Sequence, residues 1–364
     1  MLRFTPLGVR WAAMAILLTA LAWFAAWPSG IGTAGATEGG LADRADFDFR
    51  IEQTLGTMLP LDALPSGAQQ VMVGVYPINV YELDLDANTY RMNAYVWLRW
   101  RGDFDPVGSL EFANSLELWG FTKELYLETP KELPDGSKYQ HMRIEGRFFQ
   151  PFDLSQYPLD RQELSLWLEN TTSPIDEIVY VPDHASGYGD GVNIKAWDVV
   201  SYGASTYLHE YGTDFGDPSE PQGSRYAGLK FSFELERNAN MFVWKLLIPL
   251  MIVMVTSWTA LLLSPLLVEV RMAMPAGALL AVIFLRDMVM SAIPETPTLV
   301  LADIIYVLSY AFIVLTLVQI VWANLRMNKD SPANLAHLTH IDRWSFVAQI
   351  ALFTLSLVLL VQLA

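Results

Sequence analysis

The stretch RMAMPAGALLAVIFLRDMVMSAIP, from Arg271 to Pro294, is long and apolar enough to cross a lipid bilayer as a helix. Its apolar run nevertheless contains two adjacent charged residues, Arg286 and Asp287. A charged side chain at mid-membrane costs roughly 2.5–3.5 kcal/mol on insertion scales, so we expect neither residue to face lipid. Because one helix cannot enclose water, the simplest arrangement surrounds a water-filled lumen with several copies of the helix and turns Asp287 toward it. Arg286, about 100° away around the helix, then extends to a neighbouring subunit or to the domain outside the membrane.

One stripe of this helix is suited to face such a lumen. Residues three and four apart share a helical face, and here they change from small to apolar to polar along the helix. The stripe consists of Ala273, Gly277, Leu280, Phe284, Asp287 and Ser291. Leu280 and Phe284 fit a hydrophobic gate that closes by dewetting. In the alternative interpretation, Arg286 and Asp287 lie close to the membrane interface and extend to water there.

The chain from residue 241 to 364 is predicted to form a four-helix membrane domain. Its four apolar spans cover about 242–263, 271–293, 299–322 and 346–364. A polar linker, from Asn324 to Arg343, joins the last two spans. The basic residues near the span ends, Arg271, Arg326, Lys329 and Arg343, are expected on the cytoplasmic side. We therefore predict a multi-pass protein of the cell inner membrane or plasma membrane whose preceding domain is extracytoplasmic.

Residues 37–240 are predicted to form an all-β, immunoglobulin-like extracellular sandwich. QVMVGVYPINVYELDLD, starting at Gln69, and TYRMNAYVWLRW, ending at Trp100, both alternate apolar and polar residues and are rich in β-branched and aromatic side chains. The turn Asp86-Ala87-Asn88 separates them. Further short strands with turn clusters between them favour an antiparallel sandwich.

The first 36 residues are typical of a secretory signal peptide. Two arginines precede an apolar run, which ends before the small residues Ala34-Gly35-Ala36. The alternative is an uncleaved membrane anchor, which leaves the β domain on the same side of the membrane.

Composition excludes several function classes. The chain has no cysteine, which excludes disulfides and thiolate metal sites. Its net charge of −16 disfavours nucleic acid as a partner. An acidic outer domain instead attracts cations, so we expect divalent cations such as calcium to modulate the protein. We find no nucleophile elbow, phosphate loop or metal-spaced histidine pair, and predict neither an enzyme nor a cofactor.

The segment FFQPFDLSQYPLDRQEL, from Phe148 to Leu164, resembles the signature loop of the pentameric ligand-gated ion channels, the Cys-loop receptor superfamily. Its Tyr157-Pro158-Leu159-Asp160 is similar to the aromatic-Pro-aromatic-Asp core of that loop. Gln150 and Leu164 occupy the positions of the paired cysteines of animal receptors, as in the cysteine-free prokaryotic branch. The resemblance runs from about Val71 to Ala364 and includes WLRWRGDFD, LEFAN, LPDGSKY, FELERNANMFVWKLLIPL and IPETPTLVLADIIY.

This resemblance implies a homopentamer in the lipid bilayer, with the second span of each subunit lining a pore and a small extracellular ligand bound between adjacent outer domains. It also implies that gating passes through the junction of the two domains. The junction residues are Asp84, Asp86, Tyr157, Pro158, Asp160, Arg237, Pro294 and Pro297. Acidic residues of this set are expected to couple to Arg237, which precedes the first span. The alternative is a fixed ion pair that only holds the junction together.

The ligand pocket implied by the resemblance combines two faces. The principal face is expected to contain Glu169, Tyr211, Phe215 and Tyr226, and the complementary face Tyr95 and Trp97. Aromatic rings around a carboxylate suit an amine held by cation–π attraction, although these aromatics are equally typical of a strand core. Protons are the other candidate ligand, because several Asp287 carboxylates at one level would repel each other and take up protons.

Glu269 and Asp287 predict cation selectivity, because rings of carboxylates at the two mouths of a pore concentrate permeant cations. The prediction from the sequence is therefore a ligand-gated cation channel opened by a small amine or by protons. A non-conducting membrane-bound ligand receptor is the alternative, and an extracytoplasmic enzyme on a membrane anchor is a third class.

Overall fold

The computed structural model describes residues Thr57–Met58, 64–117, 119–212, 216, 225–296 and 298–363. They separate into two compact units. One unit holds the strands, and the other holds the helices after Asn238 together with the loop Leu154–Asp160. The predicted signal peptide, Phe215 and Pro297 lie outside the described residues. The domain boundaries at 36 and 240 stay predictions.

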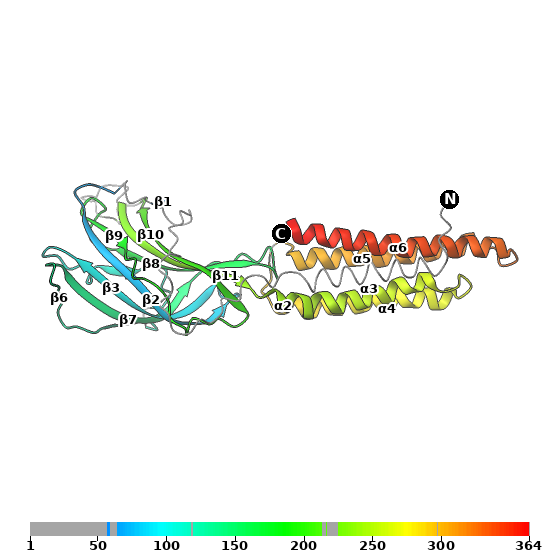
Figure 1. Ribbon diagram of the computed structural model, residues 1–364, viewed down its shortest axis with the longest axis horizontal. Coiled ribbons are helices and arrows are strands. Elements are labelled where there is room, and N and C mark those ends of the chain that lie inside the picture. Colours follow the sequence, from blue (N-terminus) through cyan, green and yellow to red (C-terminus); the bar gives the residue numbers. More distant parts are fainter. Residues whose placement is uncertain are drawn as a thin grey trace. The chain divides into compact units, whose positions relative to one another are not determined.

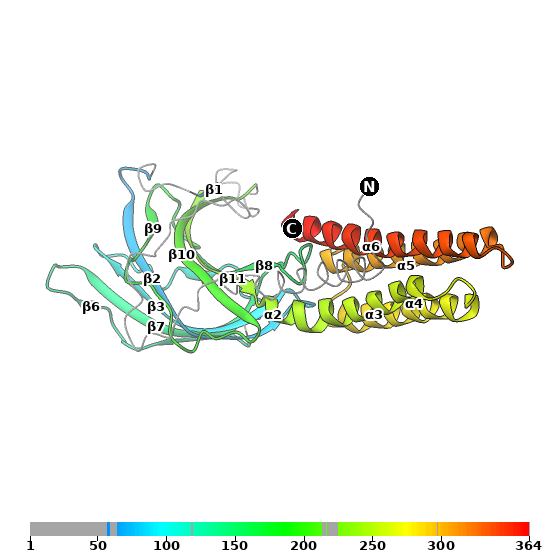
Figure 2. The ribbon, with the colours of Figure 1, turned by 45° about the vertical axis from the view of Figure 1, so that its right-hand side comes forward.

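The β unit is a sandwich of two sheets (Figures 1 and 2). One sheet has, in spatial order, β1 (Thr57–Met58), β10 (Trp197–Glu210), β11 (Arg225–Arg237), β8 (Arg161–Asn170) and β4 (Leu110–Phe112). The other has β5 (Thr122–Leu125), β7 (Lys138–Phe149), β3 (Thr89–Trp100), β2 (Gln69–Asp84) and β9 (Ile178–Pro182), with β6 (Lys131–Glu132) pairing beside β7. β2 and β9 pair in parallel, unlike the other neighbours. These two strands are far apart in the sequence, and the long connection between them allows them to run in parallel.

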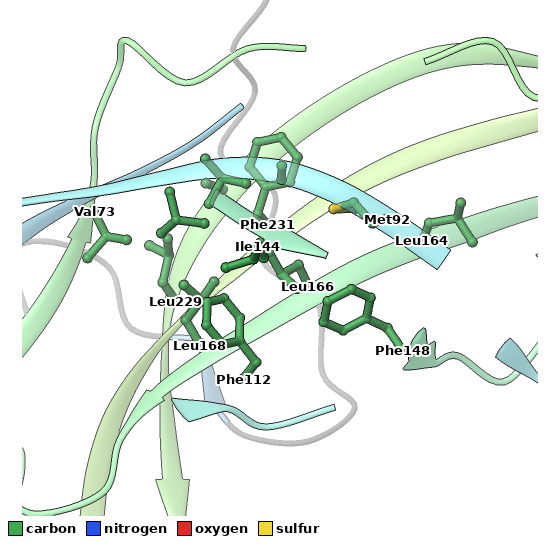
Figure 3. Packing of buried hydrophobic residues seen from close by; sticks show 14 of the residues in the cluster. Val73, Met92, Phe112, Ile144, Phe148, Leu164, Leu166, Leu168, Leu229 and Phe231 are labelled. Carbon is green, nitrogen blue, oxygen red and sulfur yellow. The ribbon is translucent and has the colours of Figure 1, made fainter. Parts of the chain in front are cut away.

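The core of the sandwich lies between the sheets (Figure 3). Along β7 buried residues alternate with partly exposed ones from Gln140 to Phe148, which is the pattern of a strand with one face on a core. Met92, Ile144 and Phe148 from one sheet meet Leu166 and Phe231 from the other. β8 differs, because its residues are buried on both faces from Leu164 onward. Its outward-facing residues are therefore covered by other side chains.

Four helical segments of the second unit are long and apolar enough to cross a membrane. They run side by side in both views (Figures 1 and 2). The first, Val243–Leu262, begins after α2 (Ala239–Phe242) and contains the π-helical turn η3 (Val243–Leu247), α3 (Ile248–Thr259) and η4 (Ala260–Leu262). The others are α4 (Val268–Met290), α5 (Leu301–Arg326) and α6 (Pro332–Leu363). The predicted fold, a β sandwich followed by a four-helix membrane domain, is confirmed.

α6 begins earlier than the sequence-based prediction of residue 346. Pro332 occupies its first turn, where the missing N–H of proline costs little, and the hydroxyl of Ser331 accepts a hydrogen bond from the backbone N–H of Asn334 at 3.3 Å. Most of the predicted polar linker is therefore helical, and the connection between α5 and α6 is limited to residues 327–331.

Candidate functional site

The predicted pore stripe lies on the exposed side of α4. All six of its residues are exposed in the single chain, including the large apolar Leu280, at 55 %, and Phe284, at 64 %. On the other side of the helix, Pro275, Ala278 and Val282 are buried in the bundle. Of the four spans, α4 is the least buried within the chain. The stripe is thus available to face other copies or water, and its role as a pore lining stays a prediction.

Arg271, near the start of α4, is buried inside the bundle, and its expected place on the cytoplasmic side stays a prediction. One of its guanidinium nitrogens lies 2.7 Å from Oδ2 of Asp342 in α6, and both side chains are only 1 % exposed. Its Nε donates to the carbonyl oxygen of Ala260 at 3.1 Å. Nε2 of Gln319 donates to the other carboxylate oxygen of Asp342, also at 3.1 Å. The ion pair and its hydrogen bonds offset the cost of burying this charge.

Arg286 has a partner within its own chain. Its Nε and one terminal nitrogen donate to Oδ1 of Asp303 at 3.0 and 2.7 Å. Asp303 lies in the first turn of α5, where a carboxylate also interacts favourably with the helix dipole. Arg286 therefore extends to a neighbouring helix, rather than to another subunit or to the outer domain, and the adjacent Asp287 stays exposed.

The loop Leu154–Asp160 caps the N-terminus of α5. The carbonyl oxygen of Ser155 accepts a hydrogen bond from the N–H of Leu301 at 2.9 Å, and that of Tyr157 accepts one from the N–H of Ala302 at 3.1 Å. These N–H groups have no partner inside the helix, and no side chain caps it. Tyr157, which precedes Pro158 through a cis peptide bond, and Asp160 are buried. The predicted signature loop thus binds directly to a membrane helix.

Of the other predicted junction residues, Asp84, Asp86 and Arg237 lie in the β unit and have partners there. Oδ1 of Asp84 accepts hydrogen bonds from the N–H groups of Asp86, at 3.1 Å, and Ala87, at 2.9 Å, and so fixes the turn after β2. The guanidinium carbon of Arg237 lies 4.1 Å from the centre of the Trp197 ring. Pro294 is half-buried. Coupling of Arg237 to an acidic residue in gating stays a prediction.

Three side chains converge on the buried carboxylate of Glu169. The hydroxyl groups of Tyr207 and Tyr211 donate to its two oxygens at 3.0 and 2.7 Å. Nδ1 of His209 lies 2.9 Å from the oxygen that Tyr207 binds. The Glu169 side chain is 5 % exposed. Burial, followed by the neighbouring Glu169, raises the pKa of both tyrosines, so they are neutral donors.

The local sequence explains how these groups meet. Tyr207 and His209 alternate along the end of β10 and share one face of the sheet, and Tyr211 follows directly after the strand at the same two-residue spacing. Gly228 in β11 lies between Tyr207 and Glu169 in the strand register. A Cβ atom there would collide with the ring of Tyr207. Glycine thus lets the Tyr207 ring cross β11 and reach the carboxylate.

Three of the predicted principal-face residues are brought together. Tyr211 binds Glu169, and its ring centre is 5.8 Å from that of Tyr226, with the rings nearly perpendicular. Phe215 lies outside the described residues. Tyr207 and His209 were not among the predicted site residues, although they and Tyr211 follow one another at two-residue intervals, which was a usable signal.

The predicted complementary face lies on the other sheet. Tyr95 and Trp97 share one face of β3, where Tyr95 packs against Tyr126 with ring centres 6.0 Å apart. The Trp97 ring nitrogen donates to Oδ2 of Asp183 at 2.8 Å. A pocket formed by these two residues with Glu169 therefore requires a second copy of the chain, and stays a prediction.

One known protein is similar to this chain over most of its length, and others are similar over about half of it. No protein-family model matches the chain. A proton-gated ion channel from Gloeobacter violaceus is 24 % identical over 292 residues, which cover 76 % of this chain and 79 % of that protein. A gamma-aminobutyric acid receptor beta subunit from Lymnaea stagnalis is 24 % identical over 51 % of this chain and 36 % of its own. The beta-4 subunit of that receptor from Gallus gallus is 22 % identical over 52 % of this chain and 38 % of its own.

These similarities support the pentameric ligand-gated ion channel family. The predicted resemblance is thereby confirmed. Because its relatives are channel and receptor subunits, the prediction that the chain is not an enzyme is confirmed as well. The match and the four membrane-length helices together identify a multi-pass membrane protein. It spans little more than a third of the two receptor subunits.

Hydrogen bonds close the signature loop of this cysteine-free chain. Oε1 of Gln150, at one predicted cysteine position, accepts from the N–H of Ser165 at 3.0 Å and from its hydroxyl at 2.7 Å. Gln162 and the backbone of Asp153 form two more bonds across the loop, at 3.1 and 2.6 Å. Leu164, at the other cysteine position, is buried in the sandwich core.

Among the residues that the structure describes, no group of three or more His, Asp or Glu is placed to hold a metal ion. The predicted modulation by divalent cations is therefore left to measurement.

Proposed function

We propose that the chain forms a homopentameric, cation-selective channel that is opened by protons reaching its extracytoplasmic domain. In this channel α4 of each subunit lines the pore. The observation that carries the proposal is the exposed stripe of α4, which includes Leu280 and Phe284 and has the exposed carboxylates of Glu269 and Asp287 near its two ends. Carboxylate rings at the mouths of a pore concentrate cations, and a narrow apolar stretch between them closes by dewetting.

Protons are favoured over a small amine by the contacts of Glu169. A carboxylate has about four lone-pair sites, and three side chains already occupy this buried one. An amine would have to compete with them. A histidine ring can take up a second proton, and a protonated His209 would form an ion pair with Glu169 at the observed 2.9 Å. The relative that covers most of the chain is named as proton-gated.

A conducting protein is favoured over a non-conducting receptor by the short connection between α5 and α6. Residues 327–331 form this connection, which offers little surface for a signalling partner. With the signal peptide removed, the β unit is extracytoplasmic, and both this connection and the one between α3 and α4 lie in the cytoplasm.

Recording from purified protein in planar bilayers tests the proposal. We expect stepwise currents that appear as the pH on the outer-domain side falls from neutral, and a reversal potential near that of the cation in a sodium chloride gradient. His209→Gln should shift activation to lower pH, whereas His184→Gln, which changes another histidine of the β unit, is the matched control. Protein that inserts but conducts at no pH, or that prefers chloride, contradicts the proposal.

A further inference from the structure

The pore helix of the proposed channel carries balanced charges. α4 contains four charged residues, of which Glu269 and Asp287 are acidic and Arg271 and Arg286 are basic. If all four acted equally on a passing ion, the helix would offer no net charge and no preference for cations. The contacts of the two arginines remove this difficulty, because each is bonded to a carboxylate from a different helix.

At the N-terminal end of α4, the charge of Arg271 is neutralised by Asp342 of α6. Its bond to Asp342 is 2.7 Å long, and water reaches neither side chain, since each is 1 % exposed. Gln319 and the carbonyl of Ala260 hold the two partners in this geometry. Glu269, two residues earlier, is exposed. The charge that α4 presents here is therefore the carboxylate of Glu269.

At the other end of α4, Arg286 is neutralised by α5. Oδ1 of Asp303 accepts both of its hydrogen bonds, at 3.0 and 2.7 Å, and the Asp303 side chain is 9 % exposed while that of Arg286 is 41 % exposed. The following residue, Asp287, is exposed on the pore stripe. The same arrangement thus recurs at both ends, with a different helix supplying the carboxylate each time.

We propose that Asp342 and Asp303, neither of which lies on the pore helix, determine the charge selectivity of the channel by neutralising Arg271 and Arg286. This inference rests on the proposed function, because it assumes that α4 lines a cation pore. Without the Asp342 carboxylate, a buried arginine keeps its charge, since a guanidinium is not deprotonated in proteins. Its field then reaches the ion path, or the side chain turns toward the water in the pore.

The test is the reversal potential of purified channels in a sodium chloride gradient. For Asp342→Asn we expect the sodium-to-chloride permeability ratio to fall roughly tenfold, the order given by five unit charges about 10 Å from the ion path after screening by salt. The double variant Arg271→Gln/Asp342→Asn removes both charges and should restore the wild-type ratio. Thr316→Val is the matched control, because it removes a neutral bond between α5 and α6, from Thr316 to Gln349 at 2.8 Å, without changing charge.

The outcomes separate this inference from the proposed function. A wild-type channel that prefers chloride overturns the proposed function itself. A cation-selective wild type with an unchanged ratio in Asp342→Asn overturns the neutralising role, as does a double variant that keeps the reduced ratio. If Asp342→Asn does not assemble, Asp303→Asn and Arg286→Gln/Asp303→Asn give the same comparison at the other end. There Arg286 is partly exposed, and an unchanged ratio in Asp303→Asn overturns the inference.

Discussion

The carbonyl oxygen of Tyr157 accepts a hydrogen bond from the backbone N–H of Ala302 at 3.1 Å. This bond joins the loop between β7 and β8 to the first turn of α5, so a movement of the loop acts on a membrane helix without any side chain between them. The same helix carries Asp303 one residue later, and Asp303 holds Arg286 of α4. One short path of bonds therefore runs from the signature loop to the predicted pore helix.

Removing only this N–H tests the path. Replacing Ala302 by its α-hydroxy analogue, lactic acid, changes the amide to an ester and leaves the side chain intact. The lost bond weakens the attachment by about 1 kcal/mol, and we expect the pH of half-maximal current to shift while the single-channel conductance is unchanged. The same exchange at Val314, in the middle of α5, is the control; an equal shift there would rule out a specific role for the loop.

Gln150 closes the signature loop, and its loss should destabilise the β unit. Gln150→Leu leaves the N–H and hydroxyl of Ser165 without their acceptor, at a cost of about 1–3 kcal/mol. We expect a lower melting temperature in detergent. Gln156→Leu changes an exposed residue of the same loop and should melt like the wild type. Equal melting of both variants would show that the Gln150 bonds contribute nothing.

The pore stripe can be mapped with single cysteines, because the chain has no natural cysteine to interfere. We expect Leu280→Cys and Phe284→Cys, both exposed, to react with a water-soluble thiol reagent during channel opening and to lose most of their current. Val282→Cys, at a fully buried position on the other side of α4, should not react. Reaction at Val282 with protection at Leu280 would place the wrong face of the helix in the pore.

Gly228 should be essential for the carboxylate cluster. In Gly228→Ala the new methyl group collides with the Tyr207 ring and forces it away from Glu169, which we expect to cost about 1–3 kcal/mol of unfolding free energy and to alter proton activation. Gly212→Ala is the matched control, since its methyl group would meet open space. Wild-type activation in Gly228→Ala would separate the cluster from gating.

The alkaline stability of the β unit should depend on Tyr207. Burial and then Glu169 raise its pKa, so the unfolded chain loses the phenol proton at lower pH than the folded protein does. The stabilisation is fully present below about pH 10 and is lost as the pH rises toward the folded value. We expect the melting temperature above about pH 10 to fall more steeply for the wild type than for Tyr207→Phe. Tyr76→Phe, at an exposed tyrosine, should follow the wild type; parallel curves for all three proteins would contradict the linkage.

The local features were the ones that the sequence predicted well. Alternation located β2 and β3 and the turn after Asp84, and apolar length located the four spans, because both signals lie within a few consecutive residues. The start of α6 was missed although Ser331-Pro332 is a helix-start signal, and with Asp342 assigned to a linker its pairing with Arg271 could not be foreseen.

Hydrophobic periodicity could not predict contacts between segments that are distant in the sequence. Arg286 and Asp303 are 17 residues apart, and the turn between α4 and α5 brings them together. His209 was predictable as a neighbour of Tyr211 on one strand face, but that this face meets Glu169 depends on the order of β10, β11 and β8 in the sheet. Such an order follows from packing of the whole domain.

Closing the signature loop through Gln150 and Ser165, in place of two sulfur atoms, makes this part of the protein independent of redox conditions. Reducing agents and oxidoreductases have no bond to act on there, so we expect the loop to form equally well in reducing and in oxidising buffer. The two backbone hydrogen bonds that attach the loop to α5 likewise involve no sulfur.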